Sequence, residues 1–202
     1  VSSYAAGEVI VRETDAARGF YMVAEGRVKL FKMSPDGREQ TLFHFGFGEP
    51  FCLCALFEGR AFLANAAALE KSTVLFIPAE DLERLATEEP SLLFNLVFLL
   101  ARRLKETMEM VESLSIRSLN ERVALFLLKL ASANEPLDSA KPIHIRLPMT
   151  HRELAKVVGS SHEALSRTFR SLSQRGLLTL EGRDVHIHDY SQLARIAGST
   201  RL

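Results

Sequence analysis

Apolar residues alternate with polar or small ones in short stretches between Tyr4 and Pro90. The alternation is clearest in residues 21–31 and 40–47, and its period of two predicts β-strands. Pro-Asp-Gly at 35–37 predicts a turn between them, because proline fixes the first central dihedral and glycine accepts a positive one. Repeated glycines indicate further turns. We therefore expect a β-sandwich or barrel-like roll, closed by a helix that begins after Pro78.

The period lengthens from about Ser91, where apolar residues recur at alternating spacings of three and four and predict one long helix. The seam lasts almost three heptads and is formed by Val97, Leu100, Leu104, Thr107, Val111 and Leu114. Two roles for this apolar face stay open on the pattern alone. It packs against its own domain, or it pairs with the same helix of a second chain.

Two capping boxes follow the seam. Ser-Leu-Asn-Glu at 118–121 opens the apolar run 123–130 and predicts a helix there. A polar loop at 133–141 and an extended segment at 143–147 come next. Thr-His-Arg-Glu at 150–153 then predicts the start of a short helix that reaches residue 158.

Gly159 ends that short helix, and Ser160 or Ser161 caps a third helix that runs to about Gln174. Two helices joined by a turn that contains glycine are typical of a helix-turn-helix. The strands predicted at 177–180 and 185–188 flank a Glu-Gly-Arg turn and would form a wing beside it.

The composition is that of a globular protein. The 202 residues are 47% hydrophobic and 25% charged, which excludes a disordered or fibrous chain. The longest apolar run, 92–101, is far shorter than the ~20 residues that cross a bilayer, so we expect no membrane partner. Cys52 and Cys54 are too close in sequence for a secreted disulfide framework, and we expect a reducing cytoplasm.

The net charge of zero conceals an uneven distribution. Residues 1–118 carry a net charge of −4, and residues 119–202 carry +4. The segment from Arg146 to Arg175 holds six basic residues and two acidic ones. This basic excess lies on the predicted helix-turn-helix, where a surface that faces DNA phosphates would need it.

Five stretches stand together in the order of a known family: GFYMVAEGRV at 19–28, DGREQTL at 36–42, FGEPF at 47–51, ALFEG at 55–59 and VGSSHEALSR at 158–167. With them the chain resembles the cyclic-AMP receptor protein and fumarate-nitrate regulator superfamily of bacterial transcription factors. The resemblance covers nearly the whole sequence.

This resemblance implies an α+β fold. A β-roll of the cyclic-nucleotide-binding jelly-roll type would span residues 1–90, a dimerisation helix 91–118 and a winged helix-turn-helix 119–202. The resemblance also implies a homodimer that binds a palindromic DNA operator. An effector bound in the roll would re-aim the helix-turn-helix of each copy, and RNA polymerase would be a further partner. No carboxylate pair, and no nucleophile with a nearby base, accompanies the histidines, so we expect no enzyme.

The third helix carries the family's base-reading pattern. Glu163, Ser166 and Arg167 match the Glu-x-x-Ser-Arg of the fumarate-nitrate branch, which implies half-sites with a TTGAT-like core. Arginine can bind O6 and N7 of guanine, and glutamate four positions earlier on the same face can accept from cytosine N4. The alternative is that Glu163 only caps the helix and Arg167 is solvated. Further DNA contacts are expected from His162, Ser161, Ser160, Thr150 and Arg170.

The family's cyclic-nucleotide pattern is broken in this chain. Cyclic-nucleotide binders have a Gly-Glu pair and an Arg-Ser pair where this sequence has Cys52-Leu53 and Phe62-Leu63. A cyclic phosphate would meet no arginine except the displaced Arg60, and burying an unpaired phosphate is costly. The comparison argues against cyclic AMP and leaves the effector unknown.

Apolar residues gather where the effector would bind. We expect a pocket for a large apolar ligand formed by Phe43, Phe45, Phe47, Phe51, Cys52, Cys54, Phe62 and Leu63. The first three of these phenylalanines alternate onto one face of a predicted strand. The alternative is that the chain's 13 phenylalanines simply fill the core of the roll.

The two cysteines also raise the possibility of haem. Phe-Cys-Leu-Cys at 51–54 stands where the haem-dependent carbon-monoxide sensor of the superfamily has Phe-Cys-Met-His, so Cys52 matches that sensor's thiolate ligand. Cys54 replaces its histidine, and His44 is a candidate to supply the imidazole instead. Three hypotheses stay open: haem or another gas-responsive metal, an apolar ligand or thiol redox signal, and inert cysteines in a factor that needs no ligand.

Overall fold

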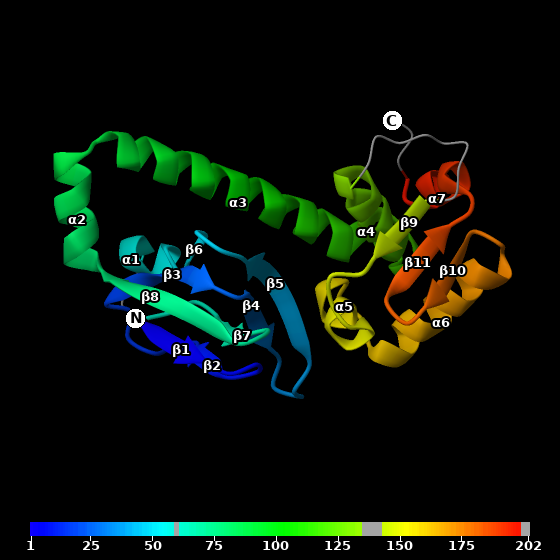
Figure 1. The fold of residues 1–202 in the computed structure, drawn as a ribbon, viewed down its shortest axis with the longest axis horizontal. Helices are drawn as coiled ribbons and strands as arrows, with labels where there is room; N and C mark the ends of the chain where they lie inside the picture. Colours follow the sequence, from blue (N-terminus) through cyan, green and yellow to red (C-terminus); the bar gives the residue numbers. More distant parts are fainter. Residues whose placement is uncertain (59–60, 135–142, 199–202) are drawn as a thin grey trace. The chain divides into compact units, whose positions relative to one another are not determined.

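The computed structural model describes residues 1–58, 61–134 and 143–198. The chain forms two compact units, Val1–Thr107 and Met108–Leu202, which divide within one long helix (Figure 1). Each unit has a hydrophobic core of its own. Most of the polar loop expected at 133–141 lies outside the described residues, and so does Arg60.

The first unit is a β-roll. Its strands are β1 (Ser2–Tyr4), β2 (Val9–Val11), β3 (Gly19–Glu25), β4 (Val28–Met33), β5 (Glu39–Phe45), β6 (Pro50–Phe51), β7 (Asn65–Ala68) and β8 (Ser72–Pro78). One sheet has the order β1-β8-β3-β6 and the other β2-β7-β4-β5, and the pairing within both is antiparallel. The turn predicted at 35–37 joins β4 to β5. The expected roll is confirmed.

Alternate side chains of the strands fill the roll. The buried core consists of Val11, Val23, Val28, Phe45, Phe51, Ala55, Phe62, Ala66 and Val74. The ring of Phe51 lies 5.4 Å from that of Tyr21 and 5.6 Å from that of Phe45, measured between centroids. Several phenylalanines therefore do fill the core, as the simpler hypothesis held.

The stretch 21–31 forms two strands rather than one. The chain turns at Gly26, whose φ is +80° and whose Cβ, if it had one, would lie 2.5 Å from the carbonyl oxygen of Lys71. Only glycine fits that close approach. The stretch 40–47 is likewise shorter than predicted, because β5 ends at Phe45.

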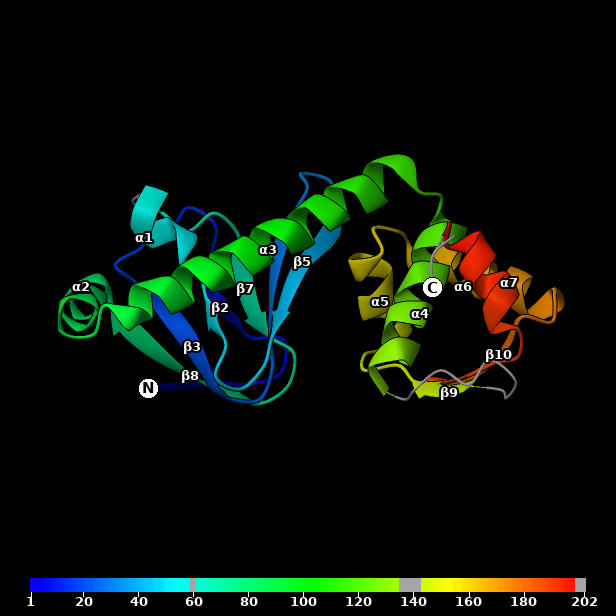
Figure 2. The same cartoon turned by 90° about the horizontal axis from the view of Figure 1, so that it is seen from above.

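Three helices accompany the strands in the first unit: α1 (Cys54–Glu58), α2 (Ala79–Glu88) and the beginning of α3 (Ser91–Ile116). The helix predicted after Pro78 is α2. The first part of α3 lies along the roll in both views (Figure 1 and Figure 2), where Leu96 and Leu99 pack with Leu82 of α2. Within the described ranges, no helix has the length and apolar character needed to cross a membrane.

The second unit contains the expected winged helix-turn-helix. After the last part of α3, its elements are α4 (Leu119–Asn134), β9 (Ile143–Arg146), α5 (His151–Val157), α6 (His162–Gln174), β10 (Leu178–Glu181), β11 (Asp184–Ile187) and α7 (Tyr190–Ile196). The strands form an antiparallel sheet of order β10-β11-β9, so the extended segment before α5 joins the predicted hairpin. Helix α7 was not predicted.

Local sequence signals account for the helix boundaries of this unit. The backbone N–H of Ser118 donates to Glu121 Oε2 at 2.5 Å, and the N–H of Glu121 donates to Ser118 Oγ at 3.4 Å, which is the reciprocal capping box predicted before α4. Gly159 has a φ of +64° between α5 and α6. A residue with a side chain rarely adopts that backbone conformation, so glycine sets the turn of the motif.

Candidate functional site

Helix α6 has one buried face and one polar, exposed face. It is anchored in the core through Leu165, Thr168, Phe169 and Leu172. Glu163, Arg167 and Arg170 are exposed, and Ser166 is half-buried. Spacings of four and three place the three charged residues on one side of the helix. The structure thus brings the residues assigned to base reading onto a single accessible face.

Ser161 fixes the start of α6, since its Oγ accepts a hydrogen bond from the N–H of Ala164 at 3.2 Å. The pKa of Glu163 is lowered, first by a hydrogen bond with its own backbone N–H, then by the Ser161 hydroxyl, with His162 and Arg167 adding smaller effects. Glu163 is therefore both part of the helix start and an ionised acceptor open to solvent. The two roles proposed for it are compatible.

The other predicted DNA contacts lie around the start of α5 and of α6. Thr150 is exposed and caps α5, with its Oγ1 accepting from the N–H of Glu153 at 3.3 Å. The N–H of Ser160 donates to the carbonyl oxygen of Ala155 at 2.8 Å within the turn of the motif. His162 is exposed. Ser160 and His162 thus lie at the N-terminal end of α6, the end that a helix-turn-helix directs at base edges, and Thr150 lies at the N-terminal end of α5.

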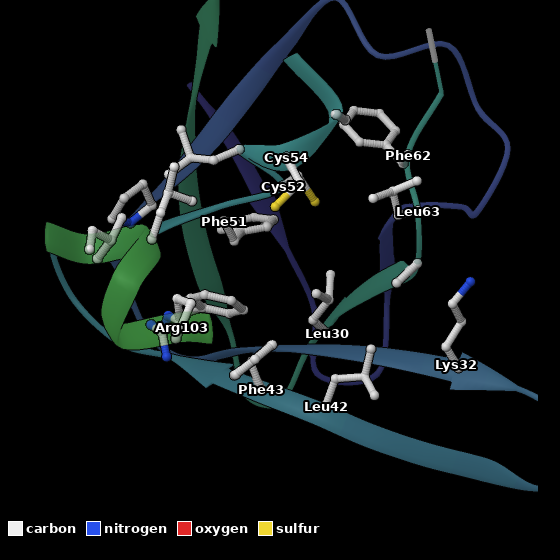
Figure 3. Close-up of a pocket in the computed structure, with 17 residues that line it drawn as sticks. Leu30, Lys32, Leu42, Phe43, Phe51, Cys52, Cys54, Phe62, Leu63 and Arg103 are labelled. Carbon is white, nitrogen blue, oxygen red and sulfur yellow. The ribbon is translucent and has the colours of Figure 1, made fainter. Parts of the chain in front are cut away.

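The first unit contains a cavity of about 250 Å³ that α3 borders through Leu99, Leu100 and Arg103 (Figure 3). Its lining is mostly apolar and consists of Leu30, Lys32, Leu42, Phe43, Phe45, Pro50, Phe51, Cys52, Leu53, Cys54, Ala55, Phe62, Leu63, Ala64, Leu99, Leu100 and Arg103. The two charged members, Lys32 and Arg103, stand on opposite sides of it (Figure 3).

Seven of the eight residues predicted to form the effector pocket line this cavity: Phe43, Phe45, Phe51, Cys52, Cys54, Phe62 and Leu63. The prediction is wrong for Phe47, whose side chain is 83% exposed. Strand alternation placed it with Phe43 and Phe45, but β5 ends before the Gly46-Phe47-Gly48 turn. The alternation therefore no longer applies at that position.

Sequence reasoning missed two notable members of the lining, Leu42 and Arg103. Pairing between β4 and β5 shifts from Leu30–Phe43 to Phe31–Thr41, so Leu42 is an extra residue in a β-bulge and faces the cavity beside Phe43. No residue type marks this bulge. Arg103 follows Leu99 by four positions, so the inward-facing stripe of α3 was the signal that could have identified it.

Arg103 forms one wall of the cavity. The centre of its guanidinium lies 4.8 Å from the ring centroid of Phe45 and 5.2 Å from that of Phe43. Its Nη2 donates to Glu49 Oε1 at 2.9 Å, and its Nη1 donates to Glu106 Oε2 at 2.8 Å. Two carboxylates thus already compensate the cation. A nucleotide phosphate would have to compete with both of them.

The cavity does not fit haem. Ligand pockets for drug-sized molecules measure ~300–1,000 Å³, and haem is larger than most such ligands, whereas this cavity has about 250 Å³. His44 is absent from the lining, since it lies between Phe43 and Phe45 on β5 and its side chain points to the opposite face. The proposed imidazole ligand is therefore wrong.

Burial raises the pKa of the Cys52 thiol to about 12, with Cys54 adding to the effect, so this thiol is protonated when the cavity holds no ligand. No three His, Cys, Asp or Glu side chains come together as a site for a metal ion in the part of the chain that the structure describes.

Helix α3 carries an exposed apolar stripe, turned by about one residue from the predicted seam. Its members are Phe94, Val97, Ala101, Leu104, Met108 and Val111, at alternating spacings of three and four. The predicted residues Val97, Leu104, Thr107, Val111 and Leu114 are exposed as well. Leu100 differs, because it is half-buried and lines the cavity. Ala101 takes its place in the exposed stripe.

Comparison with known protein families matches both units. The model described as "Cyclic nucleotide-binding domain" matches residues 1–89, and the model described as "Crp-like helix-turn-helix domain" matches residues 121–196.

Individual proteins match over nearly the whole chain. The transcriptional activator protein Anr of Pseudomonas protegens is 33% identical over 196 residues, covering 96% of this chain and 79% of that protein. The cyclic AMP receptor protein of Thermus thermophilus is 33% identical over 194 residues, covering 96% and 86%. The structure of FixK2 from Bradyrhizobium japonicum superposes with a TM-score of 0.77 at 26% identity, covering 96% and 95%.

Proposed function

Because this chain belongs to the Crp/Fnr superfamily of transcription regulators, we propose that two copies of it bind an inverted repeat with TTGAT-like half-sites under control of the roll. Regulators of this superfamily bind DNA through the helix-turn-helix and function as dimers. The relatives are transcription regulators and not enzymes, which confirms the expectation that this chain is a regulator rather than an enzyme. RNA polymerase as a further partner and the cytoplasm as the compartment are proposed from the resemblance alone.

The observation that carries the operator proposal is the exposed face of α6. Glu163 and Arg167 lie four positions apart on a helix whose opposite face is fixed in the core. A bidentate arginine contact to guanine discriminates against other bases by ~1–3 kcal/mol. Two half-sites in one dimer double this term. Arg170, one turn further along the helix, is proposed to contact phosphate.

A mobility-shift assay on such a repeat tests these roles. Arg167→Ala is expected to abolish sequence-specific complexes while leaving weak binding to unrelated DNA. Arg170→Ala should weaken binding to both DNAs alike. Arg195→Ala, which removes an exposed charge from α7, is the matched control and should change neither. Unchanged specific binding in Arg167→Ala, with complete loss in Arg170→Ala, would reverse the assignment.

We propose that the dimer forms through the exposed stripe of α3. Leu104, Met108 and Val111 are all more than half exposed in the single chain, and a heptad pattern of such residues is typical of paired helices. The alternative was that the apolar face of this helix packs on its own domain. It applies to Leu96, Leu99 and Leu100 instead, because these pack with Leu82 or line the cavity.

We further propose that the signal is not cyclic AMP. The cavity lining named above contains two cations and, among the described residues, no carboxylate to bind a ribose hydroxyl. One of the cations, Arg103, is already paired twice. Fluorescence anisotropy of labelled operator DNA with and without millimolar cyclic AMP tests this point. The affinity should be unchanged, and a tenfold increase would contradict the proposal.

A further inference from the structure

The two cysteines of the chain lie on the same wall of the cavity. Cys52 and Cys54 both line it, and Figure 3 shows both side chains directed into it. Both thiols are free, and the sequence contains no further cysteine. Two convergent thiols in a chain with no others are a potential bidentate sulfur site.

The backbone between β6 and α1 brings the two thiols together. Cys52 has a φ of +65°, in the left-handed region that a residue with a side chain rarely adopts. Leu53, between them, is buried with Phe20 and Leu82 in a separate small core. Cys52 is half-buried and Cys54 is exposed, so a molecule from solvent reaches the pair through Cys54.

We propose that this thiol pair and the cavity together bind a trivalent arsenical that carries one apolar substituent. Arsenic takes both sulfur atoms, and the substituent occupies the space between Phe43, Phe62 and Leu63. The inference rests on the proposed function, because it names the class of signal that the roll detects.

The chemistry suits an apolar cavity. In the dihydroxy form of the arsenical, two As–O bonds break and two As–S bonds form, and each thiol proton leaves with a hydroxide as water. No electrons are transferred. The product is uncharged, so no ion is buried. The protonated state of Cys52 is no obstacle either, because no free thiolate has to persist in the cavity.

The number of ligands also favours this class. A structural zinc ion takes four ligands, and only two sulfur atoms are offered here. A monosubstituted arsenical needs two sulfur atoms and brings its own third bond to carbon. The apolar lining then has a function, since the complex is stabilised when the apolar substituent is removed from water.

Leu53 provides a route from this site to α3. It packs in the same cluster as Leu96 and Leu99 of that helix. Bonds from arsenic to Cys52 and Cys54 would restrain the backbone on both sides of Leu53 and so determine how its side chain packs against α3. The same helix carries the exposed stripe proposed for dimerisation, so occupation of the site biases the arrangement of the two copies.

The test uses phenylarsine oxide and anaerobic protein. Native mass spectrometry should show one phenylarsenic adduct per chain, with loss of two waters relative to the hydrated reagent. Cys52→Ser and Cys54→Ser should each weaken binding by about 100-fold or more, because the second bond of a bidentate ligand forms intramolecularly. Leu42→Phe, which fills the cavity and keeps both thiols, should reduce the preference for the phenyl over the methyl arsenical by about tenfold.

Two results would overturn the inference. One is single-cysteine variants that bind the probe as tightly as the parent chain. The other is probe binding that leaves the affinity for the inverted repeat unchanged in a parent chain that binds this repeat specifically without the probe. The doubly substituted Cys52→Ser, Cys54→Ser chain should bind DNA normally without the probe. Failure of the arsenical site is thereby distinguishable from failure of the proposed DNA recognition, which Arg167→Ala tests alone.

Discussion

Nη2 of Arg103 lies 2.9 Å from Oε1 of Glu49, joining helix α3 to the loop before β6 across 54 positions of sequence. The second oxygen of Glu49 accepts from the backbone N–H of Gly46 at 2.9 Å. One carboxylate thus holds both the loop and the helix that borders the cavity. A signal that enters the cavity meets a wall whose position depends on this contact.

Glu49→Gln should destabilise the first unit by about 1 kcal/mol, because the contact is partly shielded from water and charge-assisted. Urea unfolding monitored by circular dichroism measures the change. Asp81→Asn is the control, since its ion pair with Arg84 is exposed and should contribute less than about 0.5 kcal/mol. Equal losses of unfolding free energy in the two variants would contradict the account that Glu49 holds the loop before β6 against α3.

Phe45 and Phe47 should differ sharply although they are two positions apart. Phe45 is 4% exposed, and its replacement by alanine is expected to cost ~3–5 kcal/mol of unfolding free energy. Phe47→Ala should cost less than about 0.5 kcal/mol, because its ring is largely solvated. Similar losses in the two variants would mean that the strand continues past Phe45.

The two thiols should react at different rates. Cys54 is exposed, whereas the pKa of Cys52 is raised from 9.0 to about 12 by burial and by Cys54. At pH 8 Ellman's reagent should therefore modify one thiol per chain quickly, and Cys54→Ser should eliminate that phase. Two equally fast thiols in the folded chain would contradict the buried position of Cys52.

The raised pKa of the Cys52 thiol also predicts that the free energy of unfolding decreases at high pH. Folding raises the pKa of this thiol, so the folded state favours the protonated form. Its contribution to stability is complete below about pH 9 and declines as the pH rises towards 12. Cys52→Ser should flatten the fall in stability over that interval.

Met108 distinguishes the observed stripe of α3 from the predicted seam, which contained Thr107 and Leu100 instead. Met108→Glu places a charge at an exposed position of the stripe and should dissociate the dimer. Lys105→Glu is the control, because Lys105 is exposed but does not belong to the stripe. The neighbouring Glu106 is less suitable, since it accepts a hydrogen bond from Arg103. Sedimentation equilibrium should show monomer for the first variant and dimer for the second.

The sequence predicted best what is decided locally. Capping residues such as Ser118 and Ser161 act within one helical turn, and the helices that they open begin where expected. The cavity was largely predictable too, because Phe43 and Phe45 share a strand face and the other predicted members follow closely in sequence. The bulge at Leu42 and the inward turn of Leu100 were not, since pairing with β4 and packing on the roll decide them. Residue type does not encode such contacts.

The central claim is that Arg167 reads a guanine in each half-site. Fluorescence anisotropy with the inverted TTGAT repeat, and with a repeat in which that guanine is adenine, measures it directly. The parent chain should prefer the first DNA by ~2–6 kcal/mol over two half-sites, and Arg167→Ala should bind both DNAs about equally. An Arg167→Ala chain that kept the full preference for guanine would contradict the account.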